Sequence, residues 1–264
     1  MPFTVSHAAA VLPLQRLTRS RIPLAAMMIG SMAPDFGYFL PMGVGRDDTH
    51  DFDGLFLFCL PVGLAVWLLF VRVLERPTIE LLPQRWRERI PRSDDVSLKA
   101  LVLAGIGILI GALTHLAWDA FTHANTSVSD LFPFIYAKMF EFRGRNIRLF
   151  HVLQYASSVG GLLALAWWGW RLKDAPLPKK PVTAPVRNFD FLTDRARIAA
   201  VAGVIGTSAG VALLTFVATR GIPIEHRVFY LITHSMTAGL MAWCVVAVLI
   251  NRTAVRQAAS TGGL

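Results

Sequence analysis

Residues 100–123 read ALVLAGIGILIGALTHLAWDAFTH, and this stretch decides the fold. Its part Ala100–Trp118 carries no charged residue and is long enough to cross a bilayer core, which takes about 17–25 helical residues. Inside a bilayer the backbone must satisfy its own hydrogen bonds, and a helix of this length does so. Four more uncharged stretches have a similar length: Gly54–Val71, Leu149–Trp170, Ile198–Thr219 and Val228–Asn251. We therefore predict an all-α, polytopic helical membrane protein with five transmembrane helices.

The overall composition supports a membrane protein. Of the 264 residues, 54% are hydrophobic and only 16% are charged, and the mean hydropathy is +0.51. A soluble domain carries about a quarter charged residues, so the apolar excess must face lipid. Two cysteines are too few for a disulfide framework or for a zinc finger built on cysteines.

The positive charges predict the topology. The loops 72–99 and 171–197 and the segment after Asn251 together carry 16 of the 26 Lys and Arg residues, which leaves ten for the opposite side. Because positively charged loops stay in the cytoplasm, we expect these loops and the C-terminus to be cytoplasmic, in the inner (plasma) membrane of a cell. We therefore attribute the net charge of +9 to the topology. We expect the lipid bilayer as a partner and expect no binding of nucleic acid.

Residues 22–42 leave an alternative open. Ile22–Met42 holds one charge, Asp35, but it is interrupted by Pro23, Pro34 and Pro41. An interior proline costs a helix about 3 kcal/mol, and an acid in mid-membrane is also expensive. We therefore expect two short helices, near residues 5–17 and 24–33, in an N-terminal segment that is outer-facing or re-entrant. If residues 22–42 did span, the charge bias would sharpen to 19 against seven.

The same pattern suggests a division of the chain. We expect a site-bearing membrane domain over residues 1–170, with the first three spans. A cytoplasmic linker follows over residues 171–197, because Pro176, Pro178, Pro181 and Pro185 favour an extended, flexible chain. Residues 198–251 then form a two-helix membrane extension.

Histidines carry the functional signal. On the five-span topology all seven lie near the outer face, whereas random placement would scatter them over both sides. His115, Asp119 and His123 are spaced by four residues and share one face of a continuing helix. Two imidazoles and a carboxylate can hold a divalent metal, and the alternative is a histidine stabilised by its neighbouring acid near a helix end.

Three more groups on the same side could complete a site. His7 follows Thr4, which can cap a short helix, and Asp35 follows Pro34 at a turn. His50 directly precedes the first span. Each also fits a plainer role, as an interfacial histidine, a turn aspartate or part of a polar loop.

Three motifs resemble an uncharacterised family of bacterial multi-pass membrane proteins: MPFTVSHAA (residues 1–9), GSMAPD (30–35) and THLAWDAFTH (114–123). The resemblance covers most of residues 1–165. That family is similar to the inner-membrane metal-dependent hydrolases, with an early His, a Pro-Asp, a Thr-His-Ser and then His-x-x-x-Asp, and remotely to zinc-dependent phospholipase C. Asp51 stands where that pattern has its serine. Carried over by position, the resemblance implies the metal ligands His7, Asp35, His50, His115 and Asp119, with His123 a possible sixth.

Two main functions fit these features. One is a metal-dependent hydrolase at the outer membrane interface, acting on a phosphoester or lipid headgroup with Zn, or alternatively Mn. Asp35 or Asp119 would take the proton of the attacking water. The phosphate would be held by arginines expected on the same side: Arg46, Arg143, Arg145 and Arg148. The other is a non-catalytic membrane protein with a structural metal or His/Asp cluster. A transporter is disfavoured, because no acid or base lies at mid-membrane in the five spans.

Overall fold

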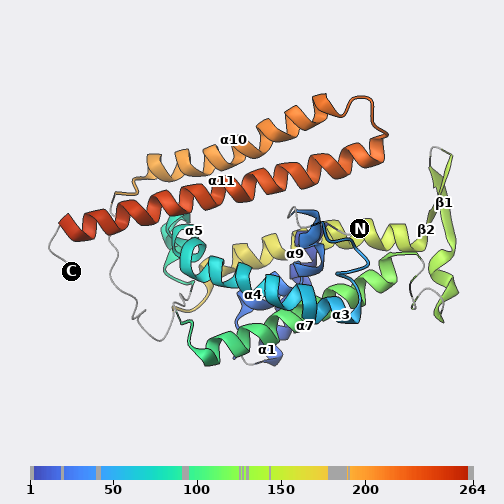
Figure 1. Cartoon of the computed structure of the whole chain (residues 1–264), viewed down its shortest axis with the longest axis horizontal. Helices are drawn as coiled ribbons and strands as arrows, with labels where there is room; N and C mark the ends of the chain where they lie inside the picture. Colours follow the sequence, from blue (N-terminus) through green and yellow to red (C-terminus); the bar gives the residue numbers. More distant parts are fainter. Residues whose placement is uncertain are drawn as a thin grey trace. The chain divides into compact units, whose positions relative to one another are not determined.

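The computed structural model (Figure 1) describes residues 3–18, 21–39, 43–90, 95–124, 126, 128, 131–142, 144–177, 189 and 191–260. Within these residues the chain is helical apart from one two-stranded hairpin. Five helices are long and apolar enough to cross a membrane. The predicted all-α, polytopic membrane fold is therefore confirmed, whereas the choice of membrane and its sidedness stay predictions.

Each long helix covers one predicted span to within one residue, and most continue past it. The first runs over Phe52–Leu81. The others are α7 (Leu98–Thr122), α9 (Leu149–Arg171, followed by the short turn η6, Leu172–Asp174), α10 (Asp194–Ala218) and α11 (Ile224–Ser260). A search for uncharged residues finds the part that lies in lipid, and a helix can continue into water with charged residues on its surface.

The first long helix contains two π-helical turns, each shortly before a proline. Its parts are α3 (Phe52–Gly54), η3 (Leu55–Cys59), α4 (Leu60–Leu69), η4 (Phe70–Leu74) and α5 (Glu75–Leu81), of which η3 and η4 are the π turns; α6 (Gln84–Arg87) follows. A proline cannot donate to the carbonyl four residues earlier and its ring clashes there, so the helix widens. For Pro77 that carbonyl belongs to Val73, which accepts a hydrogen bond of 2.9 Å from Asn251 instead.

The N-terminal segment consists of short helices, as predicted. They are η1 (a 3-10 helix, Thr4–Val11), α1 (Leu12–Leu17), α2 (Leu24–Gly30) and η2 (a 3-10 helix, Ala33–Tyr38). A single helix over residues 22–42 is not present, because α2 ends at Gly30 and Pro34 opens η2; residues 40–42 lie outside the described part. The prolines therefore divide this stretch into short helices, although it is long and apolar enough to span a membrane.

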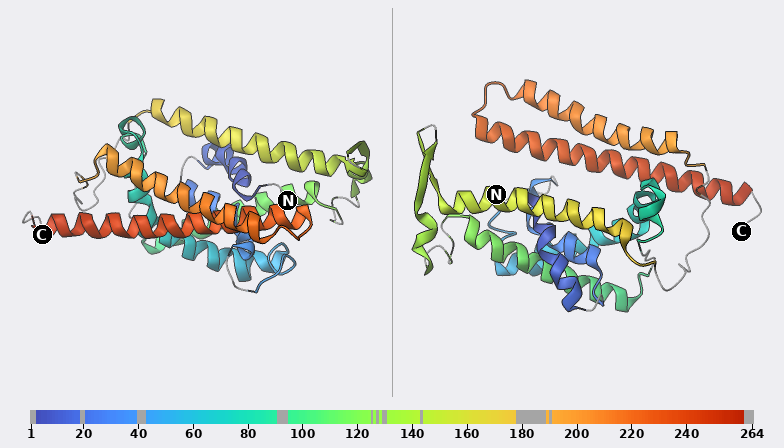
Figure 2. Two further views of the ribbon diagram at one scale, coloured as in Figure 1. Left: turned by 90° about the horizontal axis from the view of Figure 1, so that it is seen from above. Right: turned by 180° about the vertical axis from the view of Figure 1, so that it is seen from behind.

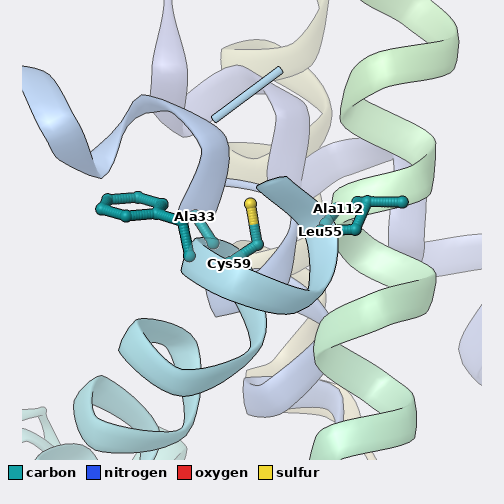
Figure 3. Close-up of a cluster of buried hydrophobic side chains, with 5 residues drawn as sticks. Ala33, Leu55, Cys59 and Ala112 are labelled. Atoms are coloured by element: carbon teal, nitrogen blue, oxygen red, sulfur yellow. The ribbon is translucent and has the colours of Figure 1, made fainter. Parts of the chain in front are cut away.

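Glycines allow α2 to lie directly on α7. A Cβ atom at Gly30 would meet the backbone of Ile108, and one at Gly111 would meet the Met27 carbonyl oxygen. A buried apolar cluster of Ala33, Leu55, Cys59 and Ala112 then joins η2, η3 and α7 (Figure 3). Both cysteines are free.

The chain divides into two compact units. One comprises Met1–Leu68 and Asp95–Arg171, and the other comprises Leu69–Asp94 and Leu172–Leu264. The predicted boundaries at residues 170 and 197 stay a prediction, and most of the proposed linker lies outside the described residues. In the second unit α10 and α11 run side by side in every view (Figures 1 and 2). Ser208 meets Gly239 there, whereas Gly203, Gly206 and Gly210 have open space around them.

A short hairpin connects α7 to α9 in the first unit. After the 3-10 turn η5 (Pro133–Tyr136), β1 (Lys138–Phe142) pairs antiparallel with β2 (Arg145–Arg148). Gly144, with φ 77°, forms part of the turn between the strands. A positive φ is open to glycine at no steric cost, which explains the residue at this position.

Adjacent glycines on α9 provide a test of the packing against η1. A Cβ atom at Gly161 would lie 2.7 Å from the Ser6 carbonyl oxygen, whereas one at Gly160 would meet nothing within 4 Å. We expect Gly161→Ala to destabilise the protein by about 1–3 kcal/mol through overpacking. Gly160→Ala is the matched control. Because alanine favours a helix more than glycine does, this variant should leave the stability of the protein unchanged or raise it by up to about 1 kcal/mol. The thermal unfolding midpoints of the two variants measure this, and equal midpoints would contradict the packing.

Candidate metal centre

Five side chains from four separate segments meet inside the first unit. His7 comes from η1, Asp35 from η2 and His50 from the loop before α3, while His115 and Asp119 lie on α7. The two carboxylates and the His115 imidazole are at most 3% exposed. The end of α7 and the start of the first long helix thus lie together at this cluster, as alternating spans require. We call these five residues the His/Asp cluster.

The approach of α2 to α7 orients His115. Where the two backbones touch, the Ser31 carbonyl oxygen lies 2.8 Å from His115 Nδ1. A carbonyl only accepts, so Nδ1 carries the proton and Nε2 keeps its lone pair. This lone pair faces the Asp119 carboxylate at 3.5 Å and the Asp35 carboxylate at 3.8 Å.

Thr49 orients His50 in a similar way. Its buried hydroxyl lies 3.2 Å from the Arg46 carbonyl oxygen, to which it donates, and 2.8 Å from His50 Nδ1. Because the carbonyl oxygen can only accept, both contacts are satisfied when the hydroxyl donates to it and accepts from His50 Nδ1–H. His50 Nε2 therefore also presents a lone pair. Asp51 caps the following helix by accepting from the Gly54 backbone N–H at 2.6 Å, a role that serine also fills.

Each carboxylate is held through one oxygen. Asp35 Oδ2 accepts a 2.7 Å hydrogen bond from the Thr4 hydroxyl, and Asp119 Oδ2 accepts a 2.9 Å bond from Arg46. The other oxygens, Oδ1 of both aspartates, are buried and have no hydrogen-bond partner in the described part of the chain. The expected role of Thr4 as a helix cap is wrong, because η1 has no side-chain cap and the hydroxyl is directed to Asp35.

The spacing of the donor atoms suits a single ion. The Nε2 atoms of His7, His50 and His115 are buried and also lack hydrogen-bond partners within the described residues. His50 Nε2 lies 3.4 Å from Asp35 Oδ1, and His7 Nε2 lies 3.6 Å from Asp119 Oδ1. His115 Nε2 lies 3.8 Å from Asp35 Oδ1 and 3.5 Å from Asp119 Oδ2. Ligand atoms at about 2.1 Å from one ion stand about 3.0–3.4 Å apart in octahedral or tetrahedral geometry. Slight contraction would bring these donors around one metal.

Two groups of possible metal donors share His115. His7, His115 and Asp119 form one set and Asp35, His50 and His115 the other, each with ligand atoms within 4.8 Å of one another. His115 belongs to both sets, and its Nδ1 is occupied by Ser31, so it offers a single nitrogen. The arrangement therefore has three imidazole nitrogens and two carboxylate oxygens for one ion.

The surroundings of His7 and Asp35 keep both side chains in the protonation states that bind a metal. Burial, together with the neighbouring His115, lowers the pKa of His7 to about 4, so its imidazole is neutral at physiological pH. Burial raises the pKa of the Asp35 carboxyl, but His50, His115 and Thr4 outweigh this effect and lower it overall. Neutral imidazoles and ionised carboxylates are the forms that bind a metal.

His123 and Arg46 lie beside the cluster. α7 ends at Thr122, and the extended backbone of His123 brings its Nδ1 to 3.5 Å from Asp119 Oδ2. Its Nε2 is buried and unpaired within the described residues. Burial lowers the pKa of His123, and Arg46 lowers it further. Besides holding Asp119, Arg46 has a buried Nη1 with no hydrogen-bond partner among the described residues.

The other candidate residues occupy different places. Arg145 and Arg148 lie on the hairpin, where Arg148 stands over the Tyr136 ring, and Arg143 lies outside the described residues. His151 begins α9 beside Phe150. His226 and His234 belong to the second unit, where His234 contacts Thr215 at 3.3 Å.

The supporting residues escaped the sequence analysis for a physical reason. Ser31 acts through its carbonyl oxygen, which no side-chain pattern reveals. Thr49 stands next to His50 in the sequence, and this adjacency was the one local signal for it. The contact between Thr4 and Asp35 joins residues 31 positions apart and depends on the tertiary fold.

Comparison with known proteins places the chain in a family. A family model described as "Domain of unknown function (DUF4184)" matches residues 1–253. No curated protein and no solved structure matches the chain. The predicted membership of an uncharacterised family is thus confirmed, and the similarity to metal-dependent hydrolases stays a prediction.

The pKa of His7 predicts a pH dependence of the metal-free protein. Between pH 6.5 and about 4 the unfolded chain binds a proton at His7 that the folded chain does not. Stability should therefore fall as the pH drops through this window, by up to about 3 kcal/mol from this residue. The unfolding midpoint of chelator-treated protein should fall more steeply with acid than that of His7→Gln. Parallel pH profiles would show that His7 is not buried in its neutral form.

Proposed function

The chain belongs to the DUF4184 family, and we propose that it is a membrane-embedded, metal-dependent hydrolase whose site is the His/Asp cluster. The proposal is carried by five buried donor atoms that have no hydrogen-bond partner among the described residues and belong to two groups sharing His115. Unpaired buried polar groups are strongly destabilising, and a bound cation would satisfy all five at once.

The donor set favours zinc. Three imidazoles and two carboxylates, with no thiolate, suit Zn²⁺ and also Mn²⁺. Cys59 contributes nothing, because its Sγ lies 3.6 Å from the Thr49 carbonyl oxygen and the cysteine belongs to the apolar cluster. Ser31, Thr49 and Thr4 supply the hydrogen bonds that typically orient metal ligands from the second coordination sphere. We propose His7, Asp35, His50, His115 and Asp119 as the ligands and place His123 beside the ion.

The surrounding residues fit hydrolysis of a phosphoester. A metal in the cluster would lower the pKa of a bound water to about 7. Asp35 or Asp119 would accept the proton of the attacking water through an oxygen that does not bind the ion. Arg46 would hold a phosphate oxygen with Nη1, which has no hydrogen-bond partner among the described residues. Its bond to Asp119 and its interaction with Tyr38 fix the guanidinium in place.

The position of the site favours a substrate at the level of the lipid headgroups. Asp119 lies three residues before the last residue of α7, and His115 lies seven before it. At 1.5 Å per residue these positions are about 5 and 10 Å from the helix end. A phosphate-bearing lipid would present its ester at this depth.

A non-catalytic role is the second candidate, and the number of ligands favours it. Catalytic zinc keeps an open position for water beside about three protein ligands, whereas a structural site is saturated. Five protein donors would leave little room unless one carboxylate moves away. If all five donors stay bound, the metal would only hold η1, η2 and the loop before α3 against α7.

A hydrolysis assay distinguishes the two roles. We expect the zinc-loaded protein in lipid nanodiscs to hydrolyse a phosphodiester such as bis(p-nitrophenyl) phosphate or a phospholipid. His115→Ala should reduce the rate about 100-fold or more, because it removes a ligand. His151→Ala is the matched control, a histidine of the same unit outside the cluster, and should retain the rate. Bound zinc without turnover of any phosphoester would overturn the hydrolase proposal and favour the structural role.

An arginine variant in the same assay tests the phosphate contact. Arg46→Gln should retain the metal and lower kcat/KM about 10–100-fold, the loss expected for a hydrogen bond to a charged group. Arg16→Gln, at an exposed position of α1, should behave like the unchanged protein. If Arg46→Gln retained full activity, the arginine would not bind the substrate.

A further inference from the structure

The hairpin between α7 and α9 carries two aromatic residues on one face. Residues directly opposite each other in an antiparallel pair share a face, and successive residues alternate. Phe140 pairs with Ile147 and Phe142 with Arg145, so these four residues share one face. Glu141 pairs with Asn146 on the other face.

The aromatic face of the hairpin is largely uncovered. Phe140 is 53% exposed and Phe142 is 59% exposed, and Phe134 in the preceding turn is 60% exposed. An isolated two-stranded hairpin is at best marginally stable in water, and exposed aromatic clusters mark an interaction surface. Something outside the described part of the chain must cover this face.

The position of the hairpin in the first unit indicates what covers its aromatic face. Both flanking helices, α7 and α9, are long and apolar enough to span a membrane. The hairpin lies crosswise at the ends of these helices, as Figure 1 and the right-hand view of Figure 2 show. A segment that connects the ends of two spans lies at the boundary between lipid and water, where aromatic side chains are enriched.

The charges around the aromatic face match lipid headgroups. Lys138, Arg145 and Arg148 are exposed on the strands, against one acid, Glu141, whose carboxylate is paired with Lys138 at 3.0 Å. Arginine and lysine beside aromatic residues typically bind the phosphates of lipids while the rings enter the upper acyl region.

We propose that the hairpin Lys138–Arg148 lies in the plane of the membrane surface, with Phe140 and Phe142 inserted at the headgroup level and its basic residues bound to lipid phosphates. The occupant of the aromatic face is thus the lipid of the surrounding bilayer. This surface is independent of the metal and of any catalytic activity.

Adjacent residues of β1 provide the test. The environment-sensitive dye NBD is attached to Phe142→Cys or to Glu141→Cys in the full chain carrying Cys59→Ser and Cys244→Ala. The protein is reconstituted in phosphatidylcholine–phosphatidylglycerol vesicles with a nitroxide near the top of the acyl chain. We expect blue-shifted emission and at least about twofold stronger quenching at position 142 than at 141, because the two side chains point to opposite faces. Phe140→Cys and Asn146→Cys form a second pair with the same expectation.

Two results would overturn the proposal. Equal quenching on both faces would show that the hairpin stands in water. Blue-shifted emission at positions 140 and 142 without nitroxide quenching would show that protein, for example a second copy of the chain, covers the aromatic face. A chelator-treated sample should give the same pattern as the zinc-loaded one, which separates this result from the outcome for the metal site.

Discussion

Five buried donor atoms that lack hydrogen-bond partners are the constraint on which the first unit depends. Three imidazole nitrogens and two carboxylate oxygens are buried in the His/Asp cluster, and no group of the described residues forms a hydrogen bond with them. Burying such groups unpaired costs several kcal/mol, so the fold must recover this energy at the same place. A bound cation would do so and would tie three chain segments to α7. The hydrogen bonds that Ser31, Thr49 and Thr4 form with His115, His50 and Asp35 then orient these three side chains.

Much of the fold could be predicted because lipid imposes simple rules. Uncharged stretches of sufficient length located all five long helices, and the prolines in residues 22–42 correctly indicated short helices in place of a sixth span. The helix ends were less predictable, since α11 continues to Ser260 with charged residues that a search for uncharged stretches excludes. The π turns before Pro61 and Pro77 and the hairpin were not foreseen. Whether a chain widens a helix or pairs two short strands depends on contacts distant in sequence.

The candidate site was predictable in its members and unpredictable in its geometry. Spacing by four residues correctly brought His115 and Asp119 together on one helix face, and the clustering of histidines near span ends pointed to His7 and His50. His123 continued the same spacing, but α7 ends at Thr122, so its position follows the extended backbone. The close contact of Gly30 and Gly111 with the facing backbones sets the depth at which Ser31 meets His115. Such contacts depend on how two helices pack against each other, and neither helix sequence alone predicts them.

Measurement of bound metal tests the central claim most directly. The detergent-purified protein is reloaded with zinc, dialysed and analysed by plasma mass spectrometry, beside the double variant His115→Ala/Asp119→Ala and the control His151→Ala. A single five-donor centre predicts about one equivalent of zinc in the unchanged protein and in the control, and less than about a tenth in the double variant. X-ray absorption at the zinc edge should show nitrogen and oxygen ligands with an imidazole signature. Absence of zinc from the reloaded protein, or equal zinc in the double variant, would contradict the account.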